Sequence, residues 1–533
     1  MSKRKAIIWV ASFALLVIAL LTTIAYWMIR IDPFFHYHKP RTNEYFYTLD
    51  NERSQNDGII KHFDYQGLIT GTSMTQNFKT SDAELLWKGL KFIKVPFSGA
   101  SYKEINDNIA TAIKYNPKLE VIIRGLDLGM FFNDKNSMRF DLGEYPTYLY
   151  DNDVFNDVQY VFNRDVIFSR AIPMTEANDE PHFRGGITSF DQYSNWMNKK
   201  TFGRNTLYPN GVSSIKLCEP VHLSDQERET IIENIHQNVT SLADENPQIK
   251  FLYFFTPYSI QWWGSLADGS NGNIYKHIEA EKVIIEEIIQ HKNIKLFSFN
   301  NQAKITTDLN NYKDWSHYGE WINSLILHFI YENRCLISID NYKEYLEDEL
   351  LLYTTFDYEK LNEQTDYDDD YDAMIKVAEE EFGIVGKELQ LDSELNQLSN
   401  ATIIEDQYDG KPGVLCQGCL GRGSTEGTDS EYIRDVDFVG LKTRIEDIGS
   451  NRFIVLRGKK LKDAGMPRVF IYDNTGRVVA QCGESYRNLD TEWHKYYLDV
   501  TGLTGEVTIV FNGGYIDMSG PDSQYVFSDI VLY

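Results

Sequence analysis

The sequence of 533 residues predicts an α/β domain with a doubly wound parallel sheet, preceded by one transmembrane helix and followed by a β-sandwich. Three observations predict this arrangement. An uncharged apolar run near the N-terminus is long enough to cross a membrane. Short apolar runs then alternate with helical stripes, which is typical of a parallel sheet covered by helices. Beyond about residue 395, apolar residues recur with a period of two, which favours strands.

The N-terminal segment has the features of a membrane anchor. A basic cluster at residues 3–5 precedes residues 6–29, which carry no charge. About 20 apolar residues span a bilayer core as a helix, and the basic side stays cytoplasmic. We therefore expect a single-pass cell-membrane protein with a cytoplasmic N-terminus and an extracellular bulk. A cleaved signal peptide is the alternative, but no small-x-small cleavage site follows the run.

The composition argues against several classes of function. The formal net charge of −26 argues against nucleic acid, because neutralising a phosphate backbone requires basic side chains. The five cysteines are too few for a disulfide framework in a chain of this length. Cys416 and Cys419 form a CxxC motif without a second pair at zinc spacing, so we expect neither a metal nor a redox role there.

The first part of the chain divides where its pattern changes. Residues 1–30 form the cytoplasmic tip and the anchor, and residues 31–58 form a juxtamembrane segment. The α/β domain covers residues 59–334. Its strands are expected at residues 68–70, 92–97, 121–123, 249–255 and 294–299. Residues 133–219 are too long for a simple connection and predict an insert or lid.

The C-terminal part separates into two segments. Residues 335–394 are strongly acidic and are interpreted as a solvated connector. Residues 395–533 are interpreted as a β-sandwich because helical signals are weak there. Within this segment, Asp473-Asn474-Thr475-Gly476 lies between two short apolar runs and is a hairpin signature.

One serine follows the first predicted strand. Ser73 lies in Gly71-Thr72-Ser73-Met74, just before a predicted helix. In open α/β sheets, ligands bind beyond the carboxyl ends of the strands, where this serine would project. The start of the helix offers free N–H groups to a developing oxyanion. Turns are rich in Gly, Thr and Ser, so the serine needs a catalytic partner to be significant.

A candidate partner precedes the last helix of the α/β domain. Asp314 and His317 occur in Asp314-Trp315-Ser316-His317. A carboxylate three residues before a histidine can hold one imidazole nitrogen and leave the other free to accept a proton from a serine hydroxyl. An N-cap aspartate is the usual role of such a motif on its own. With Ser73 at the first strand, the sequence predicts a catalytic triad of Ser73, His317 and Asp314.

The two motifs resemble those of SGNH (GDSL-type) hydrolases, over about residues 60–330. That family carries a Gly-x-Ser block after its first strand and an Asp-x-x-His block near its end. The resemblance implies an SGNH/flavodoxin-like sheet and an oxyanion hole formed in part by Ser73. The family's second block, a glycine that contributes an N–H to the hole, corresponds to Gly99 in Ser98-Gly99-Ala100-Ser101.

The third block departs from the family pattern. SGNH hydrolases have Gly-x-Asn, and this chain has Gly125-Leu126-Asp127. An ionised aspartate accepts but cannot donate a hydrogen bond, so the contribution of Asp127 to the oxyanion hole is open. Asp127 could be protonated, could hold Arg124, or could be structural.

The anchor narrows the resemblance to membrane-tethered SGNH-like proteins of teichoic-acid D-alanylation and alginate O-acetylation. This implies a serine esterase or O-acyltransferase that acts on acyl groups of cell-surface polysaccharides or cell-wall polymers. It also implies a membrane-bound O-acyltransferase as a partner that supplies the acyl unit. A non-catalytic scaffold of a polymer-modification machine is the alternative, and Asp127 in place of asparagine favours it.

The C-terminal segment is similar in general shape to jelly-roll carbohydrate-binding modules. The resemblance implies that Trp493, Tyr496 and Tyr515 stack on sugars, although aromatic residues of this kind also fill cores. Asp529, before the terminal apolar strand, is similar to the structural calcium ligand of some such modules. No other cofactor is expected.

Overall fold

A computed structural model describes residues 3–142, 145–177, 185–197, 201–367, 370–418, 438–449, 451–462, 467–474, 476, 478–483, 490–513 and 523–533. The chain divides into two compact units, Met1–Asp370 and Tyr371–Tyr533. Each unit is described by itself.

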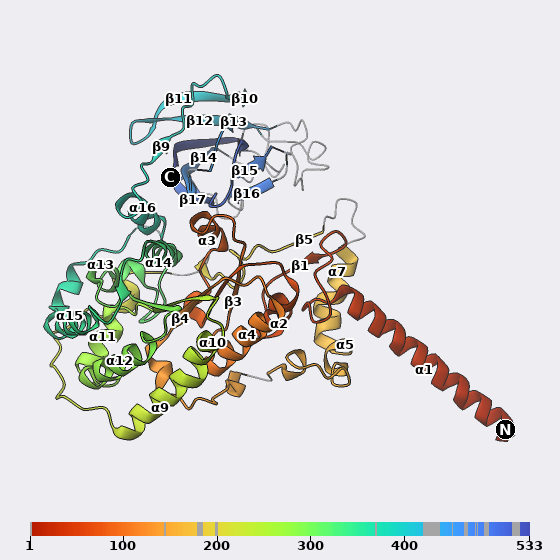
Figure 1. The fold of residues 1–533 in the computed structure, drawn as a ribbon. Coiled ribbons are helices and arrows are strands. Elements are labelled where there is room, and N and C mark those ends of the chain that lie inside the picture. Colours follow the sequence, from red (N-terminus) through yellow and green to blue (C-terminus); the bar gives the residue numbers. More distant parts are fainter. Residues whose placement is uncertain are drawn as a thin grey trace. The chain divides into compact units, whose positions relative to one another are not determined.

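Helix α1 (Lys3–Ile31) stands away from the rest of the first unit for most of its length (Figure 1). Among the described residues it is the one helix long and apolar enough to cross a membrane. Its side chains are largely exposed until Met28 and Ile31, which are buried against the first unit. The predicted apolar helix is therefore present, and its last turn is part of the folded unit.

The first unit is built on a six-stranded sheet in the order β3-β2-β4-β6-β7-β8. The strands are β2 (Gly67–Gly71), β3 (Phe92–Pro96), β4 (Val121–Leu126), β6 (Lys250–Phe255), β7 (Ile294–Ser298) and β8 (Leu336–Ile337). All neighbours are parallel except β7 and β8. The predicted parallel α/β region is confirmed. Strand β3 follows β2 in the chain and lies on one side of it, and the next strand, β4, lies on its other side. The strand order therefore reverses at β2.

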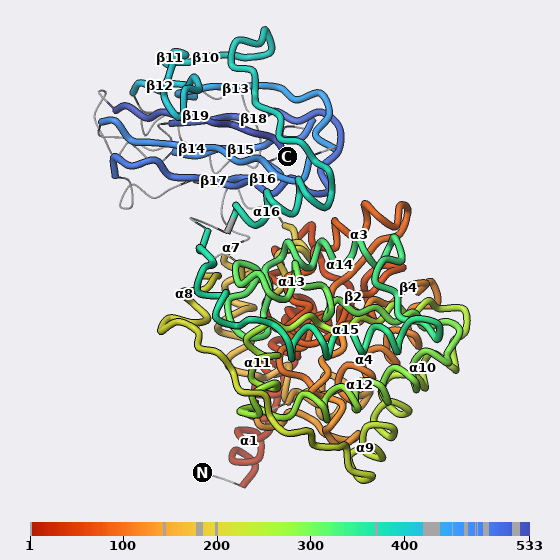
Figure 2. Tube along the Cα trace, turned by 90° about the vertical axis from the view of Figure 1, so that its left-hand side faces the viewer, coloured from red at the N-terminus to blue at the C-terminus, as the bar shows by residue number. Residues whose placement is uncertain are grey.

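Helices cover both faces of this sheet. Figures 1 and 2 show α3 (Thr80–Leu86) and α14 (Glu320–Glu332) on one face, with α4 (Tyr102–Tyr115), α9 (Asp225–Ile235) and α12 (Ile274–Ile288) on the other. The remaining helices outside the insert are α2 (Glu52–His62), η1 (Ser73–Thr75), η2 (Leu128–Phe132), η7 (His236–Thr240), α10 (Ser241–Glu245), α11 (Ile260–Ala267), α13 (Ala303–Thr306), η8 (Leu309–Asn311), α15 (Tyr342–Thr355) and η9 (Tyr358–Glu363). The doubly wound arrangement buries both faces, which explains why the central strands are apolar throughout.

The long segment between β4 and β6 contains short elements. They are η3 (Phe140–Leu142), η4 (Thr147–Leu149), α5 (Val158–Val161), α6 (Arg164–Val166), η5 (Ile167–Ala171), α7 (Ile172–Ala177), β5 (Gly186–Ile187) and α8 (Arg204–Leu207). Strand β5 pairs in parallel with β1 (Phe46–Tyr47) from the segment after α1. The insert is thus tied to the juxtamembrane segment.

The predicted acidic connector over residues 335–394 is wrong in its first half. Strand β8 joins the sheet, and α15 contacts α11 and α12. Tyr345 and Tyr353 bury one side of α15, while most of its acidic residues face away from the core. The acidic composition reflects the solvated face of a packed helix, and the boundary between the units lies after Asp370.

Two carboxyl groups lie in the interior where α15 meets α12. Glu281 and Glu349 are fully buried, and the Tyr345 hydroxyl donates to Glu281 Oε1 at 2.7 Å. Burial raises the pKa of both carboxyl groups above the ordinary value, and the mutual repulsion of the pair raises that of Glu349 further. At pH values above the ordinary glutamate pKa, these carboxyl groups therefore keep protons in the folded unit that they would release in the unfolded chain.

The second unit is a β-sandwich, preceded by α16 (Asp370–Glu380). One sheet has the order β10-β13-β18-β15-β16, with β10 (Gln397–Ser399), β13 (Gly440–Ile445), β18 (Val507–Asn512), β15 (Arg468–Asp473) and β16 (Val478–Gly483). The other has the order β11-β12-β19-β14-β17, with β11 (Ala401–Tyr408), β12 (Lys411–Gln417), β19 (Gln524–Leu532), β14 (Phe453–Lys462) and β17 (His494–Asp499), and β9 (Lys387–Glu388) pairs with β19. Side chains of both sheets form one apolar core. The predicted β-rich C-terminal region is confirmed, and β15 and β16 form the expected hairpin, although Thr475 of its turn lies outside the described residues.

The buried carboxyl pair predicts a pH dependence of stability. An unfolded glutamate titrates near pH 4.3, and the folded pKa is higher. Between these values the folded unit binds more protons, so its free energy of unfolding falls as the pH rises. We expect the thermal midpoint of the full chain in detergent to fall between about pH 5 and about pH 8, and Glu281→Gln to reduce this fall.

The matched control is Glu286→Gln, because Glu286 lies on the same helix with its side chain partly exposed. This variant should keep the wild-type pH dependence. Equal slopes for the wild type and Glu281→Gln would contradict the role of the buried pair.

Candidate active site

Ser73 lies at the carboxyl end of β2, where the strand order reverses. Gly71 ends the strand with φ of +152°, and a Cβ there would lie 2.6 Å from the Thr75 side chain. The chain therefore turns sharply, and Ser73 begins η1 (Ser73–Thr75). The Thr72 hydroxyl caps this turn by accepting from the Met74 N–H at 3.4 Å. The turn leaves the Ser73 side chain partly exposed above the sheet.

The segment after Ser73 is fixed from two neighbouring elements. Lys94 of β3 is fully buried and its ammonium donates to the carbonyls of Gln76 and Phe78. Burial lowers the pKa of Lys94 to about 7. Asn323 of α14 donates to the carbonyl of Met74 at 3.2 Å. These contacts hold the backbone around Ser73 in place.

Three side chains form a hydrogen-bonded chain at this edge of the sheet. Ser73 Oγ lies 2.9 Å from His317 Nε2. His317 Nδ1 lies 2.9 Å from both carboxylate oxygens of Asp314. Burial opposes ionisation of Asp314, but hydrogen bonds from the His317 ring and from nearby backbone N–H groups outweigh it and hold its pKa well below the usual range. An ionised Asp314 can therefore orient the His317 ring toward Ser73.

A tight loop brings Asp314 and His317 together. Tyr312 and Tyr318 form an isolated antiparallel bridge across the loop, and the Lys313 N–H donates to the His317 carbonyl at 3.1 Å. Asp314 Oδ1 accepts from the backbone N–H groups of Ser316 and His317 at 3.0 and 2.8 Å. The local turn therefore fixes the Asp314 carboxylate beside the His317 ring, independently of the contact with Ser73.

Two backbone N–H groups near Ser73 are available to an oxyanion. Within the described residues, the N–H groups of Ser73 and Gly99 have no internal acceptor. Gly99 has φ of +63°, a left-handed conformation that favours glycine. The chain around it turns because the Ala100 N–H donates to the Phe97 carbonyl.

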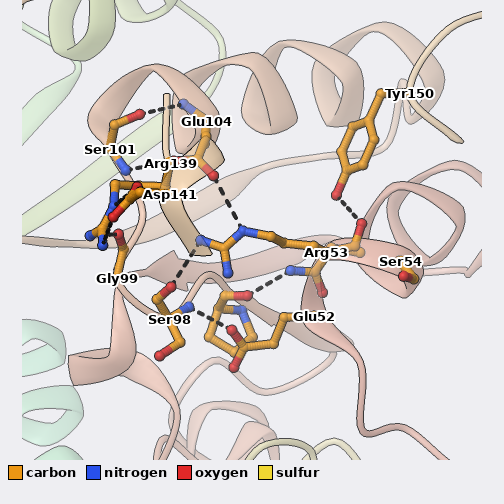
Figure 3. Close-up of polar contacts among 12 residues, drawn as sticks. Glu52, Arg53, Ser54, Ser98, Gly99, Ser101, Glu104, Arg139, Asp141 and Tyr150 are labelled. Carbon is orange, nitrogen blue, oxygen red and sulfur yellow. Dashed lines mark hydrogen bonds and ion pairs between the residues drawn. The ribbon is translucent and has the colours of Figure 1, made fainter. Parts of the chain in front are cut away.

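Charged side chains hold the Ser98–Gly99 turn (Figure 3). Glu52 Oε2 accepts from the Ser98 N–H at 2.5 Å, and the Arg53 guanidinium donates to the Ser98 carbonyl at 2.9 Å. Arg139, from the insert, donates to the Gly99 carbonyl at 2.5 Å and pairs with Asp141. The Ser98 carbonyl belongs to the same planar peptide group as the Gly99 N–H, so the bond from Arg53 also fixes the direction of that N–H.

Asp127 accepts hydrogen bonds from three hydroxyl groups. Its Oδ2 accepts from Thr72 Oγ1 at 2.6 Å, and its Oδ1 accepts from Thr256 Oγ1 at 2.9 Å and from the Tyr258 hydroxyl at 2.8 Å. Burial raises the pKa of Tyr258 well above its usual value, and the Asp127 carboxylate raises it further, so the phenol keeps its proton. The prediction that Asp127 serves the oxyanion hole is not supported, because this carboxylate is already an acceptor for three donors.

Arg124 does not pair with Asp127. Its guanidinium is fully buried, donates to the Asn238 carbonyl at 2.6 Å, and lies 5.1 and 5.8 Å from the ring centroids of Tyr102 and Tyr253. Burial lowers the pKa of Arg124. Of the three roles open for Asp127, the structural one fits its contacts.

A polar cavity of about 900 Å³ adjoins the site. Among its lining residues are Glu52, Arg53, Gln76, Tyr145, Gln159 and Trp196. Trp196 meets the His317 ring edge to face, with the centroids 6.0 Å apart. Lys313 Nζ lies 3.6 Å from the centroid of the Trp196 ring. The insert thus supplies an aromatic wall between the cavity and the candidate base.

Some contributing residues have weak sequence signals. Thr256 and Tyr258 follow β6, and residues at the carboxyl end of a parallel strand are candidates for any site on that edge. Arg139 and Trp196 come from the insert, where no periodic pattern aligns them with Ser73. Only the fold brings these two residues to the site.

The residues predicted in the second unit have mixed outcomes. Tyr496 lies in the apolar core and its hydroxyl is 2.8 Å from that of Tyr525, so the prediction that it stacks on sugars is wrong. Asp529 pairs with Lys411 at 2.5 Å and with Arg457 at 3.2 Å, so a calcium ligand there is not supported. Trp493 is partly exposed and its ring meets that of Tyr408 at 5.3 Å.

Two further predictions concern residues at the edge of the described chain. Tyr515 and Cys419 lie outside the described residues. Cys416 is buried in the core of the sandwich, and burial raises the pKa of its thiol to about 12. A thiol in this state is a poor metal ligand and a poor nucleophile.

Comparison with known proteins gives distant structural likenesses only. No protein-family model and no curated protein matches the chain. A family two carbohydrate esterase from Cellvibrio japonicus is 10% identical with a TM-score of 0.18, over 28% of this chain and 33% of that one. The chain thus spans about a third of that esterase.

Two other solved structures are similar over parts of the chain. A protein described as a platelet activating factor from Streptococcus pneumonia is 9% identical with a TM-score of 0.27, over 55% of this chain and 90% of that one. A family 6 carbohydrate-binding module from Clostridium cellulolyticum, in complex with xylose, is 15% identical with a TM-score of 0.16, over 25% and 88%. TM-scores this low establish no family, so the functional conclusion depends on the side chains of the site.

The hydroxyl cage around Asp127 predicts the effect of restoring the asparagine of the SGNH pattern. In Asp127→Asn an NH₂ group replaces one accepting oxygen, so at least one hydroxyl loses its acceptor. We expect the free energy of unfolding to fall by about 1–3 kcal/mol, measured by denaturant titration in detergent. Thr256→Val, which removes one donor and keeps the shape, should have a smaller effect. Unchanged stability with faster reaction of Ser73 would contradict this role.

The contact of Arg139 with Gly99 predicts a positioning role. Arg139→Ala should slow the reaction of Ser73 with a fluorophosphonate, because the Gly99 carbonyl loses a donor that holds the turn carrying the Gly99 N–H. The loss should be smaller than the roughly 100-fold expected for removing an oxyanion donor. Asp141→Asn is the control, because it leaves the Arg139 bond to Gly99 in place. Equal rates for Arg139→Ala and the wild type would argue against this role.

Proposed function

We propose that the first unit is an extracytoplasmic serine esterase or O-acyltransferase that acts on acyl groups of cell-surface glycans. The observation that carries the proposal is the hydrogen-bonded chain from Ser73 through His317 to Asp314. A serine hydroxyl is a poor nucleophile unless a base accepts its proton during attack. This arrangement supplies the base and the group that orients it.

The geometry supports a two-step reaction. Ser73 Oγ attacks the acyl carbonyl while His317 Nε2 accepts its proton, and the developing oxyanion accepts hydrogen bonds from the N–H groups of Ser73 and Gly99. The intermediate collapses when His317 returns the proton to the departing alkoxide, which leaves an acyl-serine. A water molecule or a glycan hydroxyl then gives its proton to His317 and attacks the acyl-serine. The products are a carboxylic acid or a new ester, and Ser73 regains its proton.

The adjoining cavity supports a carbohydrate substrate. Its lining combines amide and carboxylate side chains with the aromatic rings of Tyr145 and Trp196. Sugars are bound by such combinations, because rings cover their apolar faces and polar groups pair with their hydroxyls. The charged lining side chains are Asp50, Glu52 and Arg53, so the cavity has no excess of positive charge to favour a polyanion. Exclusion of water by the insert would favour transfer over hydrolysis.

Helix α1 supports a location at the cell membrane. We propose that α1 is a retained single-pass anchor with a cytoplasmic N-terminus, because its basic residues precede an apolar span and its last turn is built into the folded unit. In this position the first unit could receive acyl groups from a membrane-bound O-acyltransferase.

The second unit is proposed to bind glycan. The partly exposed Trp493 and its neighbour Tyr408 form an aromatic pair, and Lys459 lies 5.7 Å from the centroid of the Trp493 ring. Such a pair can stack on a sugar and hydrogen-bond to it.

A non-catalytic scaffold is the second candidate function. Asp127 favours it, because this residue leaves the site without the side-chain N–H donor of the SGNH pattern. Both candidates require the same fold and anchor, and they differ only in whether Ser73 reacts.

Covalent labelling separates the two candidates. Ser73 of the full chain in detergent should react with a fluorophosphonate, and Ser73→Ala and His317→Ala should abolish the adduct detected by mass spectrometry. Asp314→Asn should slow labelling, because the His317 ring loses its orientation.

Ser316→Ala is the matched control. Its hydroxyl lies within 3.3 Å of both Asp314 and His317 but has no place in the proton path. This variant should keep most of the labelling rate. Absence of an adduct on Ser73 at every pH would leave the scaffold as the function.

A further inference from the structure

The end of helix α1 is fixed by one buried carboxylate. Asp32 is fully buried directly after the helix. Its Oδ1 accepts from the His36 N–H at 3.0 Å and from the Tyr160 hydroxyl at 2.8 Å, and its Oδ2 accepts from the Tyr37 N–H at 2.7 Å. The chain therefore leaves α1 in a defined turn rather than through a loose linker.

Helix α5 (Val158–Val161) of the insert, together with Asp157 before it, contacts this turn. Asp157 Oδ1 lies 3.1 Å from His36 Nε2, and its Oδ2 accepts from the Tyr37 hydroxyl at 3.0 Å. The Tyr160 ring stacks on Phe34 with a centroid distance of 5.5 Å. Helices α1 and α5 are in contact, and Figure 1 shows α5 beside the inner end of α1. The position of α5 relative to α1 is thereby fixed.

The same segment exposes several large apolar side chains among polar ones. We call this set the α5 apolar face, and its members are Val154, Phe155, Val158, Phe162 and Phe168. Phe155 is 86% exposed, although its N–H is held by Asp153 Oδ1 at 3.0 Å. Leaving an apolar ring in water is unfavourable by about 25 cal/mol for each Å² of its exposed surface. Within the described part of the first unit, no side chain covers this face.

The length of α1 places this face near the outer membrane surface. Residues 6–29 carry no charge and would extend for about 36 Å as a helix, compared with about 30 Å for a hydrocarbon core. Tyr26 and Trp27 lie where an interfacial aromatic belt is expected. The turn clasped by α5 begins within two helical turns of these residues, so α5 lies at the level of the lipid headgroups.

We propose that the α5 apolar face inserts into the outer interfacial layer of the bilayer that α1 spans and forms a second membrane contact. The inference rests on the proposed role of α1 as an anchor. Lipid is the occupant that the position favours, because α5 and η5, which carry part of this face, both contact α1. Charges around the face have both signs, with Arg164 opposed by Asp151, Asp153 and Asp165. Insertion therefore depends on apolar burial, and neither salt nor anionic lipid is required.

The second contact has a consequence for the substrate. Gln159, on the same short helix as Val158, is among the residues that line the polar cavity, as is Trp196. The cavity is therefore held close to the bilayer by α5 itself. A substrate carried at the membrane surface, such as a lipid-linked or membrane-attached glycan, reaches this cavity without crossing the depth of the cell wall.

Photocrosslinking in liposomes tests the contact. The photoreactive amino acid p-benzoylphenylalanine replaces Phe155 in the full chain, which is reconstituted in phosphatidylcholine vesicles. Replacement of Leu20, exposed in the middle of α1, is the positive control, and replacement of Ile339, exposed elsewhere on the first unit, is the negative control. We expect lipid adducts at positions 20 and 155 and none at position 339, with the same yield at position 155 in low and high salt.

The outcomes distinguish the two proposals. An adduct at position 20 without one at position 155 overturns the second contact and leaves the anchor. No adduct at position 20 overturns the anchor itself. A crosslink from position 155 to a second copy of the chain, in place of lipid, also overturns the membrane contact. A second variant carries p-benzoylphenylalanine at position 158 together with Phe155→Ser. If the face inserts as a unit, this variant should give no lipid adduct at position 158. An unchanged lipid adduct at position 158 would contradict insertion of the face as a unit.

Discussion

The parallel pairing of β2 with both β3 and β4 is the constraint on which the candidate site depends. Because the strand order reverses at β2, the loops after β2 and β4 lead to opposite faces of the sheet, and open α/β sheets bind ligands at the carboxyl edge beside such a point. Ser73 lies at this edge, after the turn that Gly71 allows. The loop that carries Asp314 and His317 reaches it from the far strand β7. The parallel strands bring both loops to the same edge, and the strand order sets the distance between the serine and the histidine.

Asp127 stabilises the same edge through its hydroxyl partners. Thr72 follows β2, Asp127 follows β4 and Thr256 follows β6, so one carboxylate joins the ends of three adjacent strands. An asparagine at this position could donate to an oxyanion but could not accept all of these bonds. The aspartate therefore joins the ends of three strands but offers no side-chain donor near Ser73. In the proposed reaction the oxyanion depends on backbone N–H groups, so the contacts that hold the Ser98–Gly99 turn become more important.

The sequence predicted those features that local pattern determines. Alternating apolar runs and helical stripes predicted the parallel sheet, and the Asp314–His317 spacing predicted a contact that a short loop makes by itself. Predictions failed where long-range packing decides the outcome. The acidic stretch containing α15 buries Tyr345 and Tyr353 on one side, and composition alone does not show which side of a helix is covered. The alternating pattern of its strand does not show which side of the sheet Tyr496 lies on. Only packing against the other sheet of the sandwich places it in the core. Arg139 and Trp196 had no sequence signal, because an irregular insert carries no period from which a contact could be inferred.

The insert links three parts of the first unit that are distant in the sequence. Through Arg139 it reaches the carbonyl of Gly99, through Trp196 it meets the His317 ring, and through Tyr160 it holds the turn after α1. These contacts come from one continuous insert, so the chain that contacts the end of α1 also contributes to the surroundings of Ser73 and His317. The insert is therefore more than a cover over the site, because its side chains contact the candidate base and the Ser98–Gly99 turn directly.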